Sequence, residues 1–305
     1  MKSFIQYIRE QKELLTLIEK QIIIGKGKKY GQIVFMAGGA GSGKGFAITN
    51  FMEGSKFKIR DVDEWKKSFL KLAQLKKKYP EIRGLDLRKP KDAFKLHKWI
   101  QNKGVKEKTL NSLLSNARQG ILPNILFDIT LKDKNSITDI LPSLLAAGYD
   151  TKNINIIWVL TNYSVAIQQN RDPKRGRVVP EDIMLQTHEG AASTMFNFIK
   201  RGTPRGINGG VYIILGGKKN TVFYTDRKGN PIKTGKNKDT MVVKDFSYLT
   251  MKEPGRAMTT SSGLQDLAFD WIMKNAPRTL TNKNIFGTGQ EQESDVSRGK
   301  RKKIR

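Results

Sequence analysis

The feature that most constrains this chain is a glycine-rich loop that follows a short apolar run. The run, residues 33–37, has the length and residue types of a buried strand. It leads into Gly38-x-x-x-x-Gly43-Lys44, which is the spacing of a phosphate-binding loop. Glycines let successive backbone N–H groups approach an anion, because a Cβ would block the way. The pattern therefore predicts a strand, a phosphate loop and a helix within an α/β fold.

Each residue of this loop has an expected contact. We expect Lys44 to reach the β- and γ-phosphates of ATP, with the positive end of the following helix directed at the same anion. The residues predicted to bind the nucleotide are Gly38, Gly39, Ala40, Gly41, Ser42, Gly43, Lys44, Gly45 and Phe46. A Ser or Thr would normally follow the lysine and hold Mg²⁺, but Gly45 stands there. We therefore assign Mg²⁺ to Ser42, to a downstream carboxylate or to water. The alternative is a glycine-rich turn without a ligand.

The charge balance indicates the kind of partner. The 305 residues include 56 Lys or Arg and 28 Asp or Glu, a net charge of +28. Basic surfaces attract phosphate backbones, so nucleic acid, most simply DNA, is the predicted partner. The alternative is a lysine-rich composition spread over solvated surfaces. There is no cysteine, which excludes disulfides, and neither a membrane span nor a signal peptide is visible. We expect a soluble cytoplasmic protein, in the host cytoplasm if the source is viral.

The order of patterns predicts one kinase-like domain with additions. We expect an N-terminal helix in 1–30, the main domain in 31–250 with a basic helical insertion at 64–120, an extension at 251–280 and a disordered basic tail at 281–305. The fold class is α/β with three layers, in which helices flank a mostly parallel five-stranded sheet. The strands are expected at 33–37, 57–63, 124–130, 154–162 and 210–216.

Acidic residues follow the second expected strand. Asp63 lies nineteen positions after Lys44, and Asp61 precedes it by two. The carboxyl ends of parallel strands line the crevice where α/β sheets bind ligands. We predict that Asp63 is the general base for an attacking hydroxyl and that Asp61 contacts the substrate. The alternative is that Asp63 only caps the helix that begins near Glu64.

The end of the third expected strand carries a second polar group. Asp128 is placed to position Mg²⁺ or its waters, and Thr130 and Lys132 would then face the acceptor. A capping or turn role is the alternative for Asp128. The motif lacks the Asp-Glu pair that an ATP-driven motor would use to activate water, because Ile129 follows Asp128.

An arginine-rich segment follows the fourth expected strand. Arg171, Arg175 and Arg177 lie within seven positions, ahead of a helix that starts after Pro180. We predict a lid that closes over ATP and places guanidinium groups on the transferring phosphoryl. The alternative is a basic surface loop. His188 lies on the next helix, where we expect a surface or packing role rather than catalysis.

The insertion combines positive charge with aromatic side chains. From residue 64 to 108 there are fifteen Lys or Arg and five Asp or Glu, a net of +10. The aromatic residues among them are Trp65, Phe69, Tyr79, Phe94 and Trp99. Such side chains can stack unpaired bases. The alternative is that they form the apolar faces of two helices.

With these motifs in view, the chain resembles the P-loop kinases grouped with zeta toxins and with the 5′-hydroxyl polynucleotide kinases of bacteriophages. The resemblance covers about residues 31–217, and the Gly43-Lys44-Gly45 ending is also similar to nucleoside monophosphate kinases. It implies the strand order 2-3-1-4-5 and an ATP site at Lys44. It also implies that Asp63 is the base and that the lid arginines balance the charge of the phosphoryl group.

The function we expect is ATP-dependent transfer of the γ-phosphoryl to a hydroxyl on nucleic acid. The charge favours a 5′-hydroxyl end, and the resemblance adds the hydroxymethyl group of a modified pyrimidine in phage DNA. One alternative is a zeta-toxin-like kinase of a nucleotide sugar or nucleotide. Another is an ATP-binding, DNA-associated protein that is not a kinase.

Overall fold

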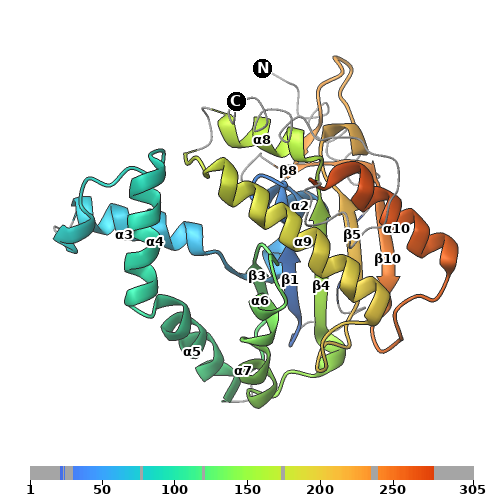
Figure 1. The fold of residues 1–305 in the computed structure, drawn as a ribbon, viewed down its shortest axis with the longest axis horizontal. Helices are drawn as coiled ribbons and strands as arrows, with labels where there is room; N and C mark the ends of the chain where they lie inside the picture. Colours follow the sequence, from blue (N-terminus) through green and yellow to red (C-terminus); the bar gives the residue numbers. More distant parts are fainter. Residues whose placement is uncertain are drawn as a thin grey trace, which may run out of the picture.

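A six-stranded sheet forms the centre of the molecule, in the order β10-β5-β4-β1-β3-β2 (Figure 1). The computed structural model describes residues 21–22, 24, 30–75, 78–118, 121–172, 176–234 and 240–277. The parallel strands are β1 (Ile33–Ala37), β2 (Lys58–Arg60), β3 (Ile125–Asp128), β4 (Ile154–Leu160) and β5 (Val211–Leu215). These five keep the expected relative order, which confirms the α/β class. The count and full order differ from the prediction because β10 (Tyr248–Lys252) pairs antiparallel with β5.

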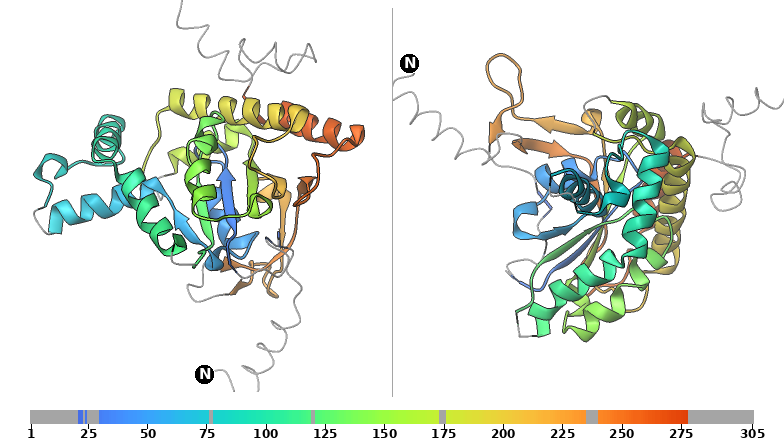
Figure 2. Two further views of the ribbon diagram at one scale, coloured as in Figure 1. Left: turned by 90° about the horizontal axis from the view of Figure 1, so that it is seen from below. Right: turned by 90° about the vertical axis from the view of Figure 1, so that its left-hand side faces the viewer.

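Both faces of the sheet are covered, so its central strands are apolar throughout. Alternate residues of β1 divide between two cores: Phe35 faces one, and Val34 and Met36 face the other. Figure 2 shows α9 (Glu181–Arg201) and α10 (Ser262–Asn275) over one face. The short helices α6 (Asn135–Thr138) and α7 (Leu141–Ala146) also pack on this side, and α2 (Lys44–Asn50) packs on the other.

A small β lobe covers α2. It contains β6 (Thr221–Phe223), β7 (Lys233–Thr234), β8 (Thr240–Met241) and β9 (Val243–Phe246). Strand β6 pairs with β9 in a two-stranded sheet that is separate from the main sheet. The remaining elements are α8 (Tyr163–Arg171) and the 3-10 turns η1 (Gly54–Lys56), η2 (Pro80–Ile82), η3 (Thr151–Asn153) and η4 (Lys218–Asn220).

The insertion stands beside the sheet and has a core of its own (Figure 1). It consists of α3 (Val62–Leu75), α4 (Pro90–Asn102) and α5 (Val105–Arg118). Its buried residues are Leu70, Ala73, Ile82, Leu87, Leu96, Ile100 and Val105. Only α5 also contributes to the main core, through Leu110, Leu114 and Ala117.

Arg60, the last residue of β2, joins the sheet to this insertion. It is 7% exposed, and its guanidinium lies 5.2 Å from the ring centre of Trp65 and 5.1 Å from that of Phe127. It donates hydrogen bonds to the carbonyl oxygen of Lys106 (2.7 Å) and to Thr109 Oγ1 (3.0 Å). Burial lowers the pKa of Arg60 to about 10, so it remains charged at neutral pH. The first turn of α5 is therefore fixed to the residue that precedes Asp61.

The aromatic residues of the insertion mostly pack against each other. Phe69, Tyr79 and Trp99 form edge-to-face pairs with centroids 5.1–5.6 Å apart, and Trp99 Nε1 donates to Glu81 Oε1 at 2.7 Å. The packing alternative is therefore correct for these three residues. Phe94 differs, because it is 59% exposed, with Lys98 Nζ 4.9 Å from its ring centre.

Some expectations concern the ends of the chain. An N-terminal helix was expected within residues 1–30, but Ile22 forms a parallel bridge with Met52. The rest of that helix and the tail at 281–305 lie outside the described residues. Within the part that the structure describes, no helix is long and apolar enough to cross a membrane.

Candidate functional site

A cavity of about 320 Å³ lies where the carboxyl ends of β1 and β3 meet the first turn of α3. It brings together the phosphate loop, the acidic residues after β2 and β3, and the arginine segment. The lining residues are Gly41, Ser42, Gly43, Lys44, Gly45, Asp61, Asp63, Glu64, Lys67, Asp128, Gln169, Gly176 and Arg177. The sequence motifs that were expected to cooperate therefore meet in one place.

The phosphate loop positions its lysine from both sides. Gly43 has a φ of 87°, a left-handed conformation that favours glycine, and α2 starts directly after it. Lys44 Nζ donates to the carbonyl oxygens of Gly38 (2.8 Å) and Gly39 (3.3 Å). It also lies 3.5 Å from Asp128 Oδ1. The ammonium group is thus held at the end of β3, beside the cavity.

The first half of the loop is fixed from behind by α9. Ala40 N–H donates to Thr187 Oγ1 at 3.3 Å, and Ala40 O lies 2.8 Å from His188 Nε2. His188 is 5% exposed, so it is a packing residue under the loop rather than a surface residue. Burial lowers its pKa to about 4, which keeps the ring neutral at physiological pH. Of the nine residues predicted to bind the nucleotide, only Gly41–Gly45 line the cavity.

Two further loop predictions require correction. The Phe46 ring lies edge-on to Phe51 and Phe223, with centroids 5.3 and 6.1 Å away, so it packs α2 against the β lobe. The Ser42 hydroxyl is buried without a hydrogen-bond partner, and the residue is 1% exposed. The Ser42 hydroxyl is therefore not exposed in this structure, and the burial gives no support to the predicted Mg²⁺ contact.

Of the two aspartates after β2, Asp61 caps the helix and Asp63 stays in its predicted place at the cavity. β2 ends at Arg60 and α3 begins at Val62, so Asp63 lies in the first helical turn rather than at the end of a strand. Asp61 Oδ1 accepts a hydrogen bond from the Asp63 N–H at 2.7 Å. Asp61 therefore caps the helix, the role we had considered for Asp63. The cap in turn fixes the Asp63 backbone at the cavity.

Asp63 is the best-paired acid of the cavity. One oxygen forms an ion pair with Arg177, and the other lies 3.2 Å from Lys66 Nζ. Burial alone would raise the pKa of Asp63, but Arg177 and Lys66 outweigh it and lower the pKa below its ordinary value. Asp63 is therefore ionised at neutral pH and can accept a hydrogen bond from a substrate hydroxyl.

Asp61 and Asp128 have the opposite electrostatic character. Burial raises the pKa of both carboxyl groups, and the negative charge of nearby Asp63 raises them further. Lys44 opposes the effect at Asp128. Carboxylate oxygens that repel each other in a partly dry site are suitable ligands for a hard cation such as Mg²⁺. No group of three or more acidic or histidine side chains with metal-site geometry occurs among the described residues.

The described part of the arginine segment reaches the cavity through Gly176 and Arg177. Asn170 closes the base of the segment, because its side chain donates to Val179 O (2.7 Å) and accepts from Val179 N (3.0 Å). Arg177 lines the cavity and pairs with Asp63. Arg171 does not line it, since its guanidinium pairs with Glu181 at the start of α9. Arg175 lies outside the described residues.

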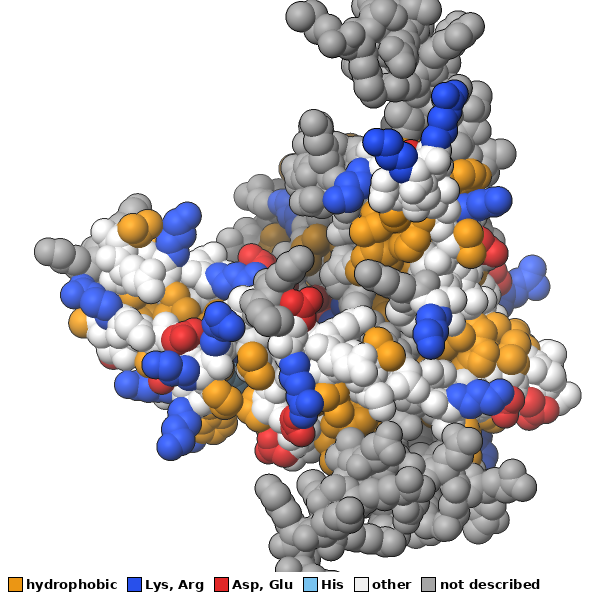
Figure 3. All heavy atoms as spheres, turned by 90° about the horizontal axis from the view of Figure 1, so that it is seen from above, with side chains coloured by type: hydrophobic (Ala, Val, Ile, Leu, Met, Phe, Trp, Pro, Cys, Tyr) orange, Lys and Arg blue, Asp and Glu red, His pale blue; other side chains and the backbone are white. Residues whose placement is uncertain are grey.

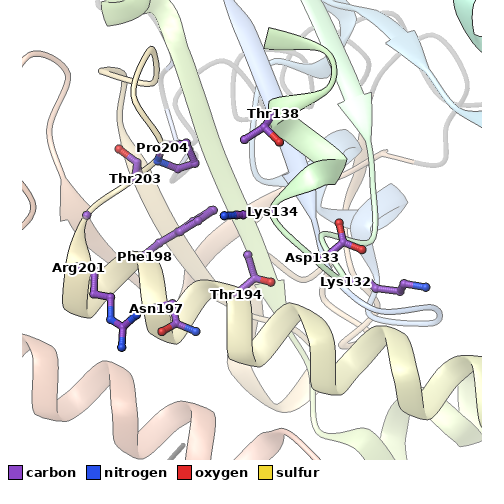
Figure 4. Close-up of a pocket in the computed structure, with 11 residues that line it drawn as sticks. Lys132, Asp133, Lys134, Thr138, Thr194, Asn197, Phe198, Arg201, Thr203 and Pro204 are labelled. Carbon is purple, nitrogen blue, oxygen red and sulfur yellow. The ribbon is translucent and has the colours of Figure 1, made fainter.

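The two residues predicted to face the acceptor after β3 do not line this cavity. Leu131 has a φ of 53°, which is rare for a branched side chain, and the chain turns there. Lys132 lines a different cavity, of about 740 Å³, between α6 and the end of α9 (Figure 4). Thr130 lines neither of the two. Their predicted role at the acceptor is therefore not supported by position.

Several lining residues were missed by the sequence interpretation. Glu64 and Lys67 continue the face of α3 that carries Asp63, and Gln169 comes from α8. Helical spacing from Asp63 could have identified Lys66 and Lys67, had the start of α3 been placed at Val62. Thr187 and His188 had no signal, because their contact with Ala40 spans about 147 positions of the chain.

Comparison with known proteins adds a family. The family described as Zeta toxin matches residues 19–228 of the chain. No curated protein matches. Solved structures with similar folds include the PezAT toxin–antitoxin system of Streptococcus pneumoniae, with 14% identity over 90% of this chain and 97% of that one, at a TM-score of 0.43.

Two further structures show the same general likeness. The AvrRxo1-ORF1:-ORF2 complex with ATP is 11% identical over 85% of this chain and 66% of that one, at a TM-score of 0.44. Deoxyadenosine kinase from M. mycoides with bound dATP is 16% identical over 59% and 90%, at a TM-score of 0.30. These likenesses are distant, and no residue role is transferred from them. None of these comparisons points to the phage polynucleotide kinases.

Proposed function

The chain belongs to the zeta toxin family of P-loop phosphotransferases, and on that premise we propose that it transfers the γ-phosphoryl of ATP to a hydroxyl of a small, nucleotide-like acceptor. The observation that carries this proposal is the shared position of Lys44, Asp63 and Arg177 around one cavity. Phosphoryl transfer requires a cation for the phosphates, an ionised acid for the hydroxyl and a further positive group for the transferring phosphoryl.

The donor side rests on the loop. Gly41–Gly45 line the cavity, and Lys44 is held there 3.5 Å from Asp128 Oδ1. A triphosphate would compete with Gly38 O, Gly39 O and Asp128 for the Lys44 ammonium, which is mobile enough to follow it. ATP is also the ligand named for one of the structural neighbours.

The transfer step rests on Asp63 and Arg177. The acceptor hydroxyl donates to the Asp63 carboxylate, which aligns its oxygen with the γ-phosphorus and takes its proton as the new P–O bond forms. The phosphoryl group leaves the β-phosphate oxygen of ADP. Arg177 lies next to Asp63 and is in reach of the same space, where it would balance charge on the transferring group.

Mg²⁺ fits the remaining acids. Asp61 and Asp128 would hold it directly or through water, since the Ser42 hydroxyl is buried and Gly45 has no side chain. When bound, the ion supplies charge neutralisation on the phosphate oxygens.

The acceptor is proposed to be small because the cavity is small. Its volume is about 320 Å³, and α3 contributes Asp63, Glu64 and Lys67 to its wall. Three of the aromatic residues that could have stacked bases are packed among themselves. A nucleotide or nucleotide sugar is therefore the first candidate.

A nucleic-acid hydroxyl is the second candidate, and the charge favours it. The net charge is +28, and lysines and arginines are spread over the insertion at the left of Figure 3. Phe94 and Lys98 remain exposed there. A 5′-hydroxyl end or a hydroxymethyl-pyrimidine in DNA could enter the cavity while the backbone lies on this surface.

The test uses γ-labelled ATP with separate acceptors: nucleosides, nucleotides, nucleotide sugars, a 5′-hydroxyl oligonucleotide and DNA with hydroxymethyluracil. We expect label on a nucleotide or nucleotide sugar, and its loss in Lys44→Ala and Asp63→Asn. Asp139→Asn changes an exposed carboxyl group away from the cavity and should keep full activity. Label on DNA alone would favour the second candidate. ATP hydrolysis that persists in Asp63→Asn, with no labelled acceptor, would contradict the kinase proposal.

A further inference from the structure

The phosphate loop does not determine its own shape in this protein. Ala40, at its centre, uses its N–H and its C=O for bonds to two neighbouring residues of α9. Thr187 Oγ1 accepts from the amide and in turn donates to Met184 O at 3.0 Å, so its orientation is fixed by the helix. The Ala40 peptide is thereby turned away from the cavity.

The residue before Ala40 is in contact with the same helix. A Cβ on Gly39 would overlap the His188 ring, so the loop backbone lies directly against the imidazole. The ring also lies edge-on to Tyr163, with centroids 5.3 Å apart, and is 5% exposed. Gly39 O is one of the two carbonyl oxygens that bind Lys44 Nζ. Displacing His188 would therefore displace an oxygen that positions the lysine.

We infer that Thr187 and His188 are positioning residues for nucleotide binding. They act by holding Gly39 and Ala40, so that the following backbone and the Lys44 ammonium are directed at the phosphates. This inference rests on the proposed function for the identity of the ligand. It assigns to α9 a role beyond covering the sheet. Neither side chain lines the cavity, and neither touches the phosphates.

The position of α9 gives this contact a second consequence. The helix begins at Glu181, directly after the arginine segment, and Asn170 binds Val179 at the base of that segment. Helix α9 therefore follows directly after the segment that contains Arg177, and the same helix supplies Thr187 and His188, which contact the phosphate loop. A triphosphate that contacts both Arg177 and the phosphate loop would therefore contact two parts of the chain that α9 connects.

The experiment measures equilibrium binding of two probes, ATP and inorganic tripolyphosphate, together with the thermal midpoint of each variant. Thr187→Val and His188→Leu remove the hydrogen-bonding groups at similar volume. Thr187→Ser and His188→Gln keep a hydroxyl and a donor at about the same reach. Thr194→Val is the matched control, since it makes the same change at another buried threonine of α9.

We expect Thr187→Val and His188→Leu to weaken both probes roughly tenfold, because a buried polar group of Ala40 loses its partner and the loop relaxes. Thr187→Ser and His188→Gln should restore binding to within about threefold of the wild type, and Thr194→Val should not weaken it. A merely structural role would lower the thermal midpoint and leave the affinity of the folded protein unchanged. That result would overturn the inference.

The proposed function can fail separately. If the protein binds tripolyphosphate but labels no acceptor, the kinase proposal fails while the variants still report on the loop. If the wild type binds neither probe, both are refuted.

Discussion

Protonation of His188 should limit the stability of the protein in mild acid. The imidazole is buried against the phosphate loop, and burial lowers its pKa from 6.5 to about 4. Above about pH 6.5 the ring is neutral in both the folded and unfolded chains, and stability is unaffected. As the pH falls below that value the unfolded chain takes up a proton that the folded chain refuses, so the free energy of unfolding decreases. The decrease stops near pH 4, where the folded chain is also protonated.

The size of the effect follows from the two pKa values. Each pKa unit corresponds to ~1.4 kcal/mol, so the full difference is about 3 kcal/mol, and about 2 kcal/mol should be lost between roughly pH 7.5 and 5. Lys44 is the charged group whose field reaches the ring, and it disfavours the protonated form further. His188→Gln has no titrating group at this position, so its free energy of unfolding should lack this dependence on pH.

The assay is urea denaturation of the wild type and of His188→Gln at about pH 7.5, 6 and 5. The difference between the two proteins isolates His188, because His97 and the shifted carboxyl groups titrate in both. We expect the free energy of unfolding of His188→Gln, relative to that of the wild type, to rise by about 2 kcal/mol as the pH falls to about 5. Parallel stability curves would refute the reasoning, since they would mean that the folded protein binds the proton as readily as the unfolded chain.

Three further predictions test other contacts. Gly39→Ala places a methyl group in the His188 ring and should lower the free energy of unfolding by about 1–3 kcal/mol, with partial recovery in the double variant with His188→Ala, as measured by urea denaturation. Gly45→Ala, where a Cβ meets no atom within 4 Å, is the control and should not be destabilised. Arg60→Met removes the bonds to Lys106 O and Thr109 and should cost about 1–3 kcal/mol in the same assay; an unchanged value would mean that the link is dispensable. If nucleic acid is the acceptor, oligonucleotide affinity should fall at least about 100-fold between roughly 50 and 200 mM salt, and Phe94→Ala should weaken binding further. An affinity that does not change with salt would show that the basic surface does not bind the phosphate backbone.

The sequence predicted best what depends on short spacing. The Gly38-to-Lys44 motif and the apolar runs of β1 and β4 were sufficient to place the sheet and the loop, because each signal is contained in a few residues. Asp63 was placed at the right cavity for an incorrect reason. The strand was taken to continue through residue 63, whereas the capping carboxyl group of Asp61 starts the helix at Val62.

Contacts between distant segments could not be predicted in this way. Whether Arg171 or Arg177 reaches the cavity depends on Glu181, which binds the first, and on Asn170, which closes the segment. Ser42 O accepts a hydrogen bond from the Thr161 hydroxyl, 119 positions later, and Phe46 packs against Phe223 of a β lobe more than 170 positions later. The prediction for Lys132 was not supported because the chain turns at Leu131. A leucine in the left-handed conformation cannot be recognised from composition or periodicity.

The separate core of α3 and α4 has a consequence for how the protein opens. A unit whose apolar contacts are internal, and which joins the sheet through Arg60 and α5, can detach from it without disturbing β1 to β5. Backbone amides of α3 and α4 should then exchange with deuterium earlier than those of the central strands. If the chain transfers a phosphoryl group as proposed, release of the product would need only this local opening, and the phosphate loop would stay ordered.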